Sequence, residues 1–243
     1  MGIRNAPMML AASSGDDVDF MVHGLIPLKF FGHKVWITTT HVTTLIVMVF
    51  IIVLALIARH AVLHGDEKPS GLQNFVEMIV EMLDNLVKGS MGRHWRPFVN
   101  YIGTIMVFIF FANTSGLFGL RPPTADYGTT LALALITFVL IQYSAFKTRK
   151  LHVFTDLFKP IPILFPINLI GEFATPLSMS LRLFGNIMAG TIMMALWYGL
   201  LPWLAQLGIP AFLHMYFDLF SGAIQTFVFA MLTMTFITDK REA

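Results

Sequence analysis

Residues Ile161 to Gly199 form a 39-residue stretch whose only charged side chains are Glu172 and Arg182. As one straight helix it would measure roughly 58 Å, whereas about 20 helical residues are enough to cross the hydrocarbon core of a bilayer. Helix tilts reach only about 40°, which does not absorb the excess length. We therefore expect a membrane helix that is strongly tilted or bent, with a bend near Pro166 or Pro176.

Arg182 is the most unusual residue of this stretch. An arginine side chain stays protonated, and placing it at the centre of a membrane helix costs roughly 2.5–3.5 kcal/mol on insertion scales. From the middle of the stretch its side chain cannot reach either membrane surface. Arg182 is therefore expected to face a water-filled cavity or a charged partner in a protein that moves ions.

The composition is that of a polytopic membrane protein. Of the 243 residues, 56% are hydrophobic and 12% are charged, whereas soluble domains carry about 25% charged residues. The absence of cysteine excludes a thiolate metal site, and we expect no metal or other cofactor. A net charge of +2 is too small to indicate nucleic acid as a partner.

Apolar runs divide the chain into an external N-terminal segment, residues 1–40, and a single all-α membrane domain, residues 41–243. Residues 71–88 read as an amphipathic surface helix, because Glu77, Glu81 and Asp84 share one face and apolar residues the other. Five membrane helices are expected, at about 41–60, 97–118, 128–147, 161–200 and 211–238.

The basic residues predict the orientation of this domain. With five spans the two termini lie on opposite sides, and eleven Lys and Arg residues fall on the side of the C-terminus against four on the other. Because basic residues are enriched in cytoplasmic loops, the N-terminus is expected outside and the C-terminus in the cytoplasm. The four residues of the outer side are Arg4, Lys29, Lys34 and Arg121.

At helical spacing, one stripe of the long segment is polar or small. It contains the candidate ion-translocation residues Asn168, Glu172, Thr175, Arg182 and Asn186, together with Met179 and Ala189, and Ser178, Gly185 and Gly190 flank it. The last span carries a second stripe of His214, Asp218, Ser221, Gly222 and Gln225. Two such stripes, one with a fixed cation and one with titratable groups, indicate an ion path.

Plainer interpretations remain open for most of these residues. Amides such as Asn186 and Gln225 often serve only as hydrogen bonds between membrane helices. His214 can be solvated at the outer interface, and Glu172 can lie close to the cytoplasmic one. Asp218 can form a static ion pair with Arg182.

The segments "PLSMSLRLFGNIMAG" (Pro176 to Gly190) and "FDLFSGAIQTFVFAMLTMTFI" (Phe217 to Ile237) resemble subunit a of bacterial F-type ATP synthases. "LFPINLIGEFATP" resembles the region before them, and the resemblance extends from about His41 onward. It implies a non-catalytic stator in the bacterial plasma membrane, whose long tilted helix pair lies against a rotating ring of proteolipid c subunits. Peripheral-stalk b subunits and the lipid bilayer are its other implied partners.

The family's motif residues match Arg182, Asn186 and Gln225 of this chain. The sequence departs from the family pattern at Thr191, where many relatives carry an acid. The family often places an acid and a histidine at the positions of Thr191 and Asp218, in either order. Because the acid here is Asp218, the inlet carboxylate is expected to lie on the last helix instead. The resemblance thus implies two offset half-channels separated by Arg182, with Asp218 and His214 in the outer one and Glu172 in the cytoplasmic one.

The sequence leaves two other functions open, a secondary ion-coupled transporter and a structural membrane scaffold. Transporters usually contain internal repeats, which this chain lacks, and a scaffold leaves Arg182 unexplained. The translocated ion can be a proton or sodium, because selectivity in this family rests mainly with the ring subunit.

Overall fold

The computed structural model describes residues 24–30, 33–63, 71–150, 163, 165–200 and 209–242. Its first feature is a β-hairpin that the sequence analysis did not anticipate. Strand β1 (Gly24–Phe30) pairs antiparallel with β2 (His33–Thr38), so the chain is all-α only from Thr39 onward. The β2 sequence HKVWIT is rich in β-branched and aromatic residues, which favour a strand.

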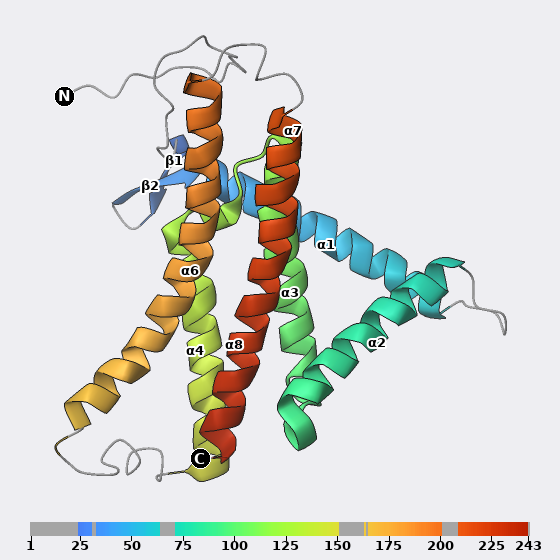
Figure 1. Cartoon of the computed structure of the whole chain (residues 1–243), viewed down its shortest axis with the longest axis vertical. Helices are drawn as coiled ribbons and strands as arrows, with labels where there is room; N and C mark the ends of the chain where they lie inside the picture. Colours follow the sequence, from blue (N-terminus) through green and yellow to red (C-terminus); the bar gives the residue numbers. More distant parts are fainter. Residues whose placement is uncertain are drawn as a thin grey trace.

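The remaining described chain is helical (Figure 1). The first helices along the chain are α1, α2, α3, α4 and α6. They are followed by α7, a π-helical segment (Met215–Ser221) and α8, and these last three run on from one another without a break. Their bounds are Thr39–Leu63 (α1), Gly71–Met91 (α2), Val99–Thr114 (α3), Tyr127–Arg149 (α4), Phe165–Leu200 (α6), Ile209–His214 (α7) and Gly222–Glu242 (α8). Five helical stretches within the described residues are long and apolar enough to cross a membrane, which confirms the expected number.

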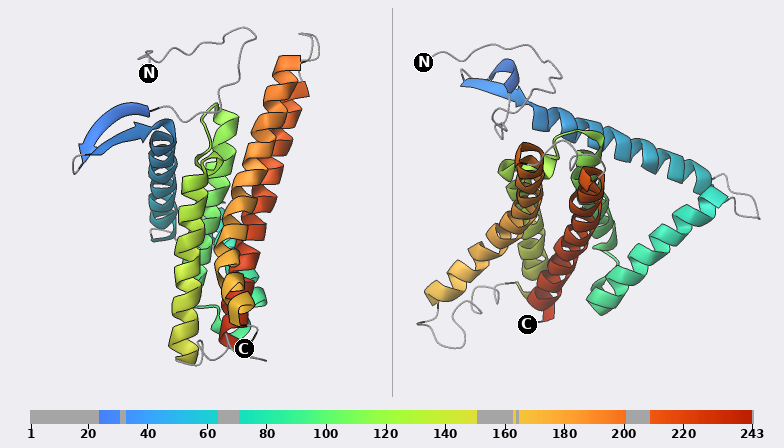
Figure 2. Two further views of the ribbon diagram at one scale, coloured as in Figure 1. Left: turned by 90° about the vertical axis from the view of Figure 1, so that its left-hand side faces the viewer. Right: turned by 45° about the horizontal axis from the view of Figure 1, so that its top comes forward.

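Helices α3, α4, α6 and α8 form a bundle, while α1 and α2 extend to one side of it and meet at an angle (Figures 1 and 2). One buried cluster joins α2, α3, α4 and α8 around Ile102, Ile141 and Met234. A second joins α3, α4, α6 and α8 around Ile109, Leu183 and Phe229. The second cluster holds the middle of α6 against α4 and α8, and so positions the segment that contains Arg182.

Helix α6 changes direction along its length, and its N-terminal part diverges from α4 and α8 (Figure 1). Pro176 lies inside this helix. Proline removes a backbone hydrogen bond and clashes with the preceding turn, so it commonly bends a helix. The bend fits the expectation that a segment this long is not one straight upright span.

Basic residues gather at the two ends of the bundle in unequal number. Lys147, Arg149 and Lys150 end α4 close to Lys240 and Arg241 of α8, and we refer to this as the Lys240 end. The opposite end, which we call the His214 end, contains the hairpin and Arg121. Several residues used to predict the orientation lie outside the described residues, namely Arg4, Lys68 and Lys159, as does most of the expected 1–40 segment.

Candidate functional site

The first polar centre is a hydrogen-bonded histidine–aspartate pair at the His214 end. His214 Nδ1 lies 2.8 Å from Asp218 Oδ2, and the two side chains are 35% and 19% exposed. Asp218 belongs to the π-helical segment Met215–Ser221, and single π turns inside α-helices occur frequently at functional sites. Asp218 therefore pairs with His214 and not with Arg182, so the static ion pair left open by the sequence is not formed.

Gly116, in a short 3-10 segment after α3, lies directly against this carboxylate. A methyl group placed on Gly116 would meet the Asp218 oxygens at 3.1 and 3.3 Å, which is tighter than ordinary contact. The φ angle of Gly116 is not positive, so its backbone does not require glycine. The absence of a side chain at this position makes room for the Asp218 carboxylate.

Gly116→Ala should therefore push the Asp218 carboxylate away from His214 and slow ATP-driven ion pumping. We expect a loss of about tenfold, less than the roughly 100-fold that a 1 Å misplacement can cost. The matched control is Gly103→Ala in α3, where the nearest atom is Leu83 Cδ1 at 3.8 Å. Equal pumping rates for the two variants in membrane vesicles would contradict the role of Gly116.

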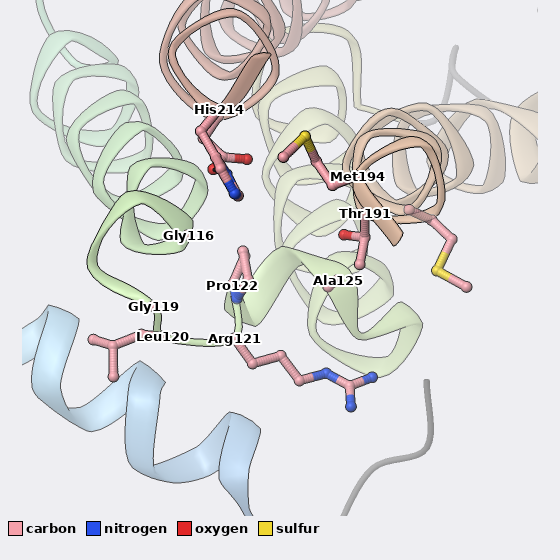
Figure 3. Close-up of a pocket in the computed structure, with 11 residues that line it drawn as sticks. Gly116, Gly119, Leu120, Arg121, Pro122, Ala125, Thr191, Met194 and His214 are labelled. Carbon is pink, nitrogen blue, oxygen red and sulfur yellow. The ribbon is translucent and has the colours of Figure 1, made fainter. Parts of the chain in front are cut away.

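The His214–Asp218 pair lines a cavity of about 350 Å³ between the α3–α4 connection, α6 and the start of the last helix. Figure 3 shows His214 and Thr191 approaching this cavity from different helices, with Arg121 on its wall. Each water in the liquid occupies roughly 30 Å³, so the cavity has room for several. The Thr191 hydroxyl donates to the Ile187 carbonyl oxygen at 2.9 Å and contributes no charge. Among the described residues that line this cavity, the carboxylate thus comes from the last helix.

The second polar centre lies midway along α6. The Arg182 side chain is exposed and has no hydrogen-bond or ion-pair partner among the described residues. On the same open face, Ser178 and Ala189 are also exposed, and a methyl group on Gly185 would meet no atom within 4 Å. This face presents a guanidinium and small side chains to whatever lies beside the chain.

Two amides, on α6 and α8, lie close to the π-helical segment. Asn186, one turn beyond Arg182 on α6, accepts a hydrogen bond from the Ser221 hydroxyl of the π segment at 3.0 Å through its Oδ1 atom. Gln225 of α8 is 7% exposed, one turn beyond Ser221. The Asn186 Nδ2 and Gln225 Nε2 atoms are buried and have no hydrogen-bond partner among the described residues. An unpaired buried donor costs about 1–3 kcal/mol, so a rotation of either amide that brings it to an acceptor is favoured.

The third polar centre is Glu172, near the Lys240 end. Its Oε2 atom accepts a hydrogen bond from Gln142 Nε2 of α4 at 2.8 Å, and its Oε1 atom pairs with the Lys240 ammonium of α8. Asn168 is half-exposed one turn before Glu172. The Thr175 hydroxyl donates to the Gly171 carbonyl oxygen at 3.2 Å, within its own helix.

The structure corrects the idea of one uniform polar stripe on α6. Met179, which the helical spacing placed on that stripe, is 2% exposed and packs into the bundle, whereas Arg182 and Ala189 are exposed. The face of α6 that packs inward is mostly apolar and includes Leu183 and Ile187, together with the buried Ser180. The bend of α6 and its packing against α4 decide which residues face inward, and helical spacing alone predicts neither.

Sequence reasoning overlooked four residues of these centres, Asn113, Gly116, Gln142 and Lys240. Asn113 is fully buried in α3; its Nδ2 donates to the Gly222 carbonyl oxygen at 3.2 Å, and its Oδ1 accepts from the Thr124 hydroxyl at 2.7 Å. The run Asn-Thr-Ser at the end of an apolar span was the signal that could have found it. The partners of Glu172 have no such signal, because they lie far away in the sequence.

Polar centres at three depths of a helical bundle are typical of polytopic membrane proteins that carry ionisable groups along an ion path. A family model described as ATP synthase A chain matches residues 41–238. The chain therefore belongs to the ATP synthase A chain family, the ion-translocating membrane subunits of that enzyme, and the resemblance noted in the sequence is confirmed.

Two curated relatives agree with this assignment. The "ATP synthase subunit a, sodium ion specific" of Propionigenium modestum is 39% identical over 218 residues, which cover 83% of this chain and 73% of that protein. The "ATP synthase subunit a" of Priestia megaterium is 37% identical over 237 residues, covering 90% of this chain and 98% of that protein. The chain is thus a multi-pass bacterial membrane protein.

Proposed function

We propose that this chain is the stator that loads and unloads the carboxylates of a rotating c-ring through two offset half-channels, separated by Arg182. The observation that carries the proposal is the exposed Arg182 guanidinium, which has no partner among the described residues and lies between two carboxylate centres on the same bundle. The chain itself carries out no bond-making chemistry in this proposal. The ring carboxylate is the partner that Arg182 lacks.

The chemistry follows from electrostatics. A ring carboxylate crosses lipid only in a neutral form, with a proton or a bound cation, because an unpaired charge in hydrocarbon is expensive. Beside Arg182 the ionised form is favoured, so the ion leaves. The Asn186 and Gln225 amides, whose nitrogens are buried in this structure, then rotate toward the ring and hydrogen-bond the freed carboxylate. Arg182 also repels cations, which prevents direct passage between the half-channels.

We assign the cavity of His214 and Asp218 to the outer half-channel and Glu172 to the cytoplasmic one. In this assignment Thr191 lines the outer half-channel, while Asn168, Thr175 and Ser178 line the cytoplasmic side of α6. The excess of basic residues at the Lys240 end supports a cytoplasmic C-terminus and an external N-terminus. The exposed apolar side chains of α1 and α2, such as Leu45 and Phe75, suit lipid and peripheral-stalk b subunits.

Cysteine cross-linking tests this arrangement, because the chain has no native cysteine. Ser178→Cys, Gly185→Cys and Ala189→Cys should cross-link to cysteines in the ring subunit, since these positions share the exposed face of Arg182. Leu183→Cys is the matched control, because Leu183 is fully buried. Equal cross-linking of Leu183→Cys would contradict the ring-facing assignment.

Leu177 and Leu181 are less suitable controls for that experiment, because they are 46% and 50% exposed. They flank the exposed face and are expected to cross-link to an intermediate extent. Phe184, which packs edge-to-face on Tyr127 at a centroid distance of 5.7 Å, remains a weak cross-linker.

Thiol labelling from each side of the membrane tests the two half-channels separately. Cysteines at Asn186 and Asp218 should react from the outside, and cysteines at Glu172 and Thr175 from the cytoplasm. Reactivity of all four positions from one side would describe a continuous channel or a secondary transporter, and would overturn the proposal.

The translocated ion has two candidates. We propose the proton, and the sodium-specific relative at 39% identity is the specific reason to test sodium beside it. ATP hydrolysis by the whole complex, measured at alkaline pH with and without sodium, distinguishes the two. Stimulation by sodium identifies sodium as the ion, and indifference identifies the proton.

A further inference from the structure

The Glu172 carboxylate is held on both of its oxygens by side chains from two other helices. Gln142 of α4 donates to one oxygen at 2.8 Å, and the ammonium of Lys240, near the end of α8, pairs with the other. These partners lie 30 and 68 residues away in the sequence. The carboxylate that the proposed function assigns to the cytoplasmic half-channel therefore has a cation of its own beside it.

The Lys240–Glu172 pair is neither fully buried nor fully solvated. The two side chains are 32% and 22% exposed, so the ammonium can leave the carboxylate for water at the Lys240 end without crossing apolar surroundings. Among the other charged groups described at this end, Arg241 lies over the Phe98 ring at 5.5 Å, Lys147, Lys150 and Asp239 are exposed, and Arg149 is half-buried with an interaction of its own.

We propose that Lys240 is a positioning residue that competes with the translocated ion for Glu172, while Gln142 keeps the carboxylate in place. This inference rests on the proposed function, in which Glu172 receives the ion on the cytoplasmic side. When an ion binds, the carboxylate is neutralised and the Lys240 ammonium moves into water. When the ion leaves, the ammonium returns and restores the pair. A carboxylate with a competing cation binds the ion less tightly and releases it faster.

The simpler reading is that the pair only ties the diverging start of α6 to the bundle. The two readings differ in a measurable quantity. Loss of a structural tie lowers the amount of assembled complex or the maximal rate. Loss of a competing cation also lowers the ion concentration that gives half-maximal pumping, because the ion then binds Glu172 without a competitor.

The experiment measures ATP-driven pumping by the whole complex in membrane vesicles against the ion concentration on the cytoplasmic side, for protons and separately for sodium. Lys240→Met removes the charge and keeps the length of the side chain. We expect it to lower the half-maximal ion concentration about fivefold, the factor for a partly exposed ion pair. Lys240→Arg should restore the native value, and Arg241→Gln, which removes the neighbouring cation, should leave it unchanged.

Lys240→Met in a Glu172→Gln background separates the proposed function of the chain from the proposed role of Lys240. Lys240→Met should then leave the half-maximal concentration unchanged, because no carboxylate remains to compete for. If Glu172→Gln alone pumps like the native complex, the assignment of Glu172 to the half-channel fails. If Glu172→Gln impairs pumping while Lys240→Met shifts no half-maximal concentration, the proposed function stands and the role of Lys240 is overturned.

Discussion

Arg182→Ala should abolish coupled ion pumping while the complex still assembles. Arg182 is exposed and forms no hydrogen bond or ion pair with the described residues, so the fold is expected to tolerate alanine. Removing one group that stabilises a developing charge commonly costs about 100- to 1,000-fold in rate, and here the barrier between the two half-channels is lost as well. ATP-driven pumping in vesicles should fall to background, and passive ion leak should rise.

Two variants sharpen this prediction. Arg182→Lys should also fail, because a lysine can lose its proton at a site where arginine stays charged, and it lacks the planar fork that matches a carboxylate. Leu181→Ala, at the neighbouring and half-exposed position, should pump close to the native rate. Coupled ATP synthesis retained by Arg182→Ala vesicles would overturn the proposed function.

Hydrophobic length made the fold predictable from the sequence. A membrane helix must satisfy its own backbone and cover the hydrocarbon core, so long apolar runs leave little choice of structure. Because residues at i and i+4 meet on a helix, the proximity of His214 and Asp218 could be inferred as well, and their side chains lie 2.8 Å apart. The bend of α6 followed from length and Pro176.

Features that depend on packing between helices were not predictable. The π-helical segment that holds Asp218 packs Phe217 against Gly190, where an added methyl group would come within 3.3 Å of Phe217 Cβ. Similarly, Gly222 allows Asn113 to approach α8, because a methyl group there would lie 2.9 Å from Asn113 Cβ. Such close approaches depend on pairs of helices, and a single sequence contains no direct sign of them.

The same limit explains why the surroundings of the proposed half-channels emerged only from the structure. Glu172 and Arg182 stand out in the sequence, because charges are rare in that stretch. Lys240 does not, since a lysine at the end of a membrane helix is usually a solvated interface residue. Its contact with Glu172 depends on how α8 ends beside α6.

Asp218→Asn should slow ion transport by about 100-fold, the lower end of the range typical of losing a positioned proton-transfer group. Asparagine keeps the shape of aspartate, so the contact with His214 and the space provided by Gly116 remain, and only the charge and the proton acceptor are lost. Asp218→Glu should pump much closer to the native rate, because it keeps the carboxylate and the cavity beside it accommodates one more methylene.

The matched control for Asp218 is Asp126→Asn, which replaces another aspartate at the His214 end. Asp126 caps α4 by accepting a hydrogen bond from the Gly128 amide at 3.0 Å, and asparagine caps a helix equally well, so transport should be unaffected. Initial rates of ATP-driven pumping, compared at several pH values around neutrality, test both substitutions. Equal rates for Asp218→Asn and the native complex across that range would remove Asp218 from the outer half-channel. The cavity of that half-channel has a threonine at position 191 and no carboxylate other than Asp218 among the described residues that line it. Without Asp218, His214 would be left as the group there that titrates near neutral pH.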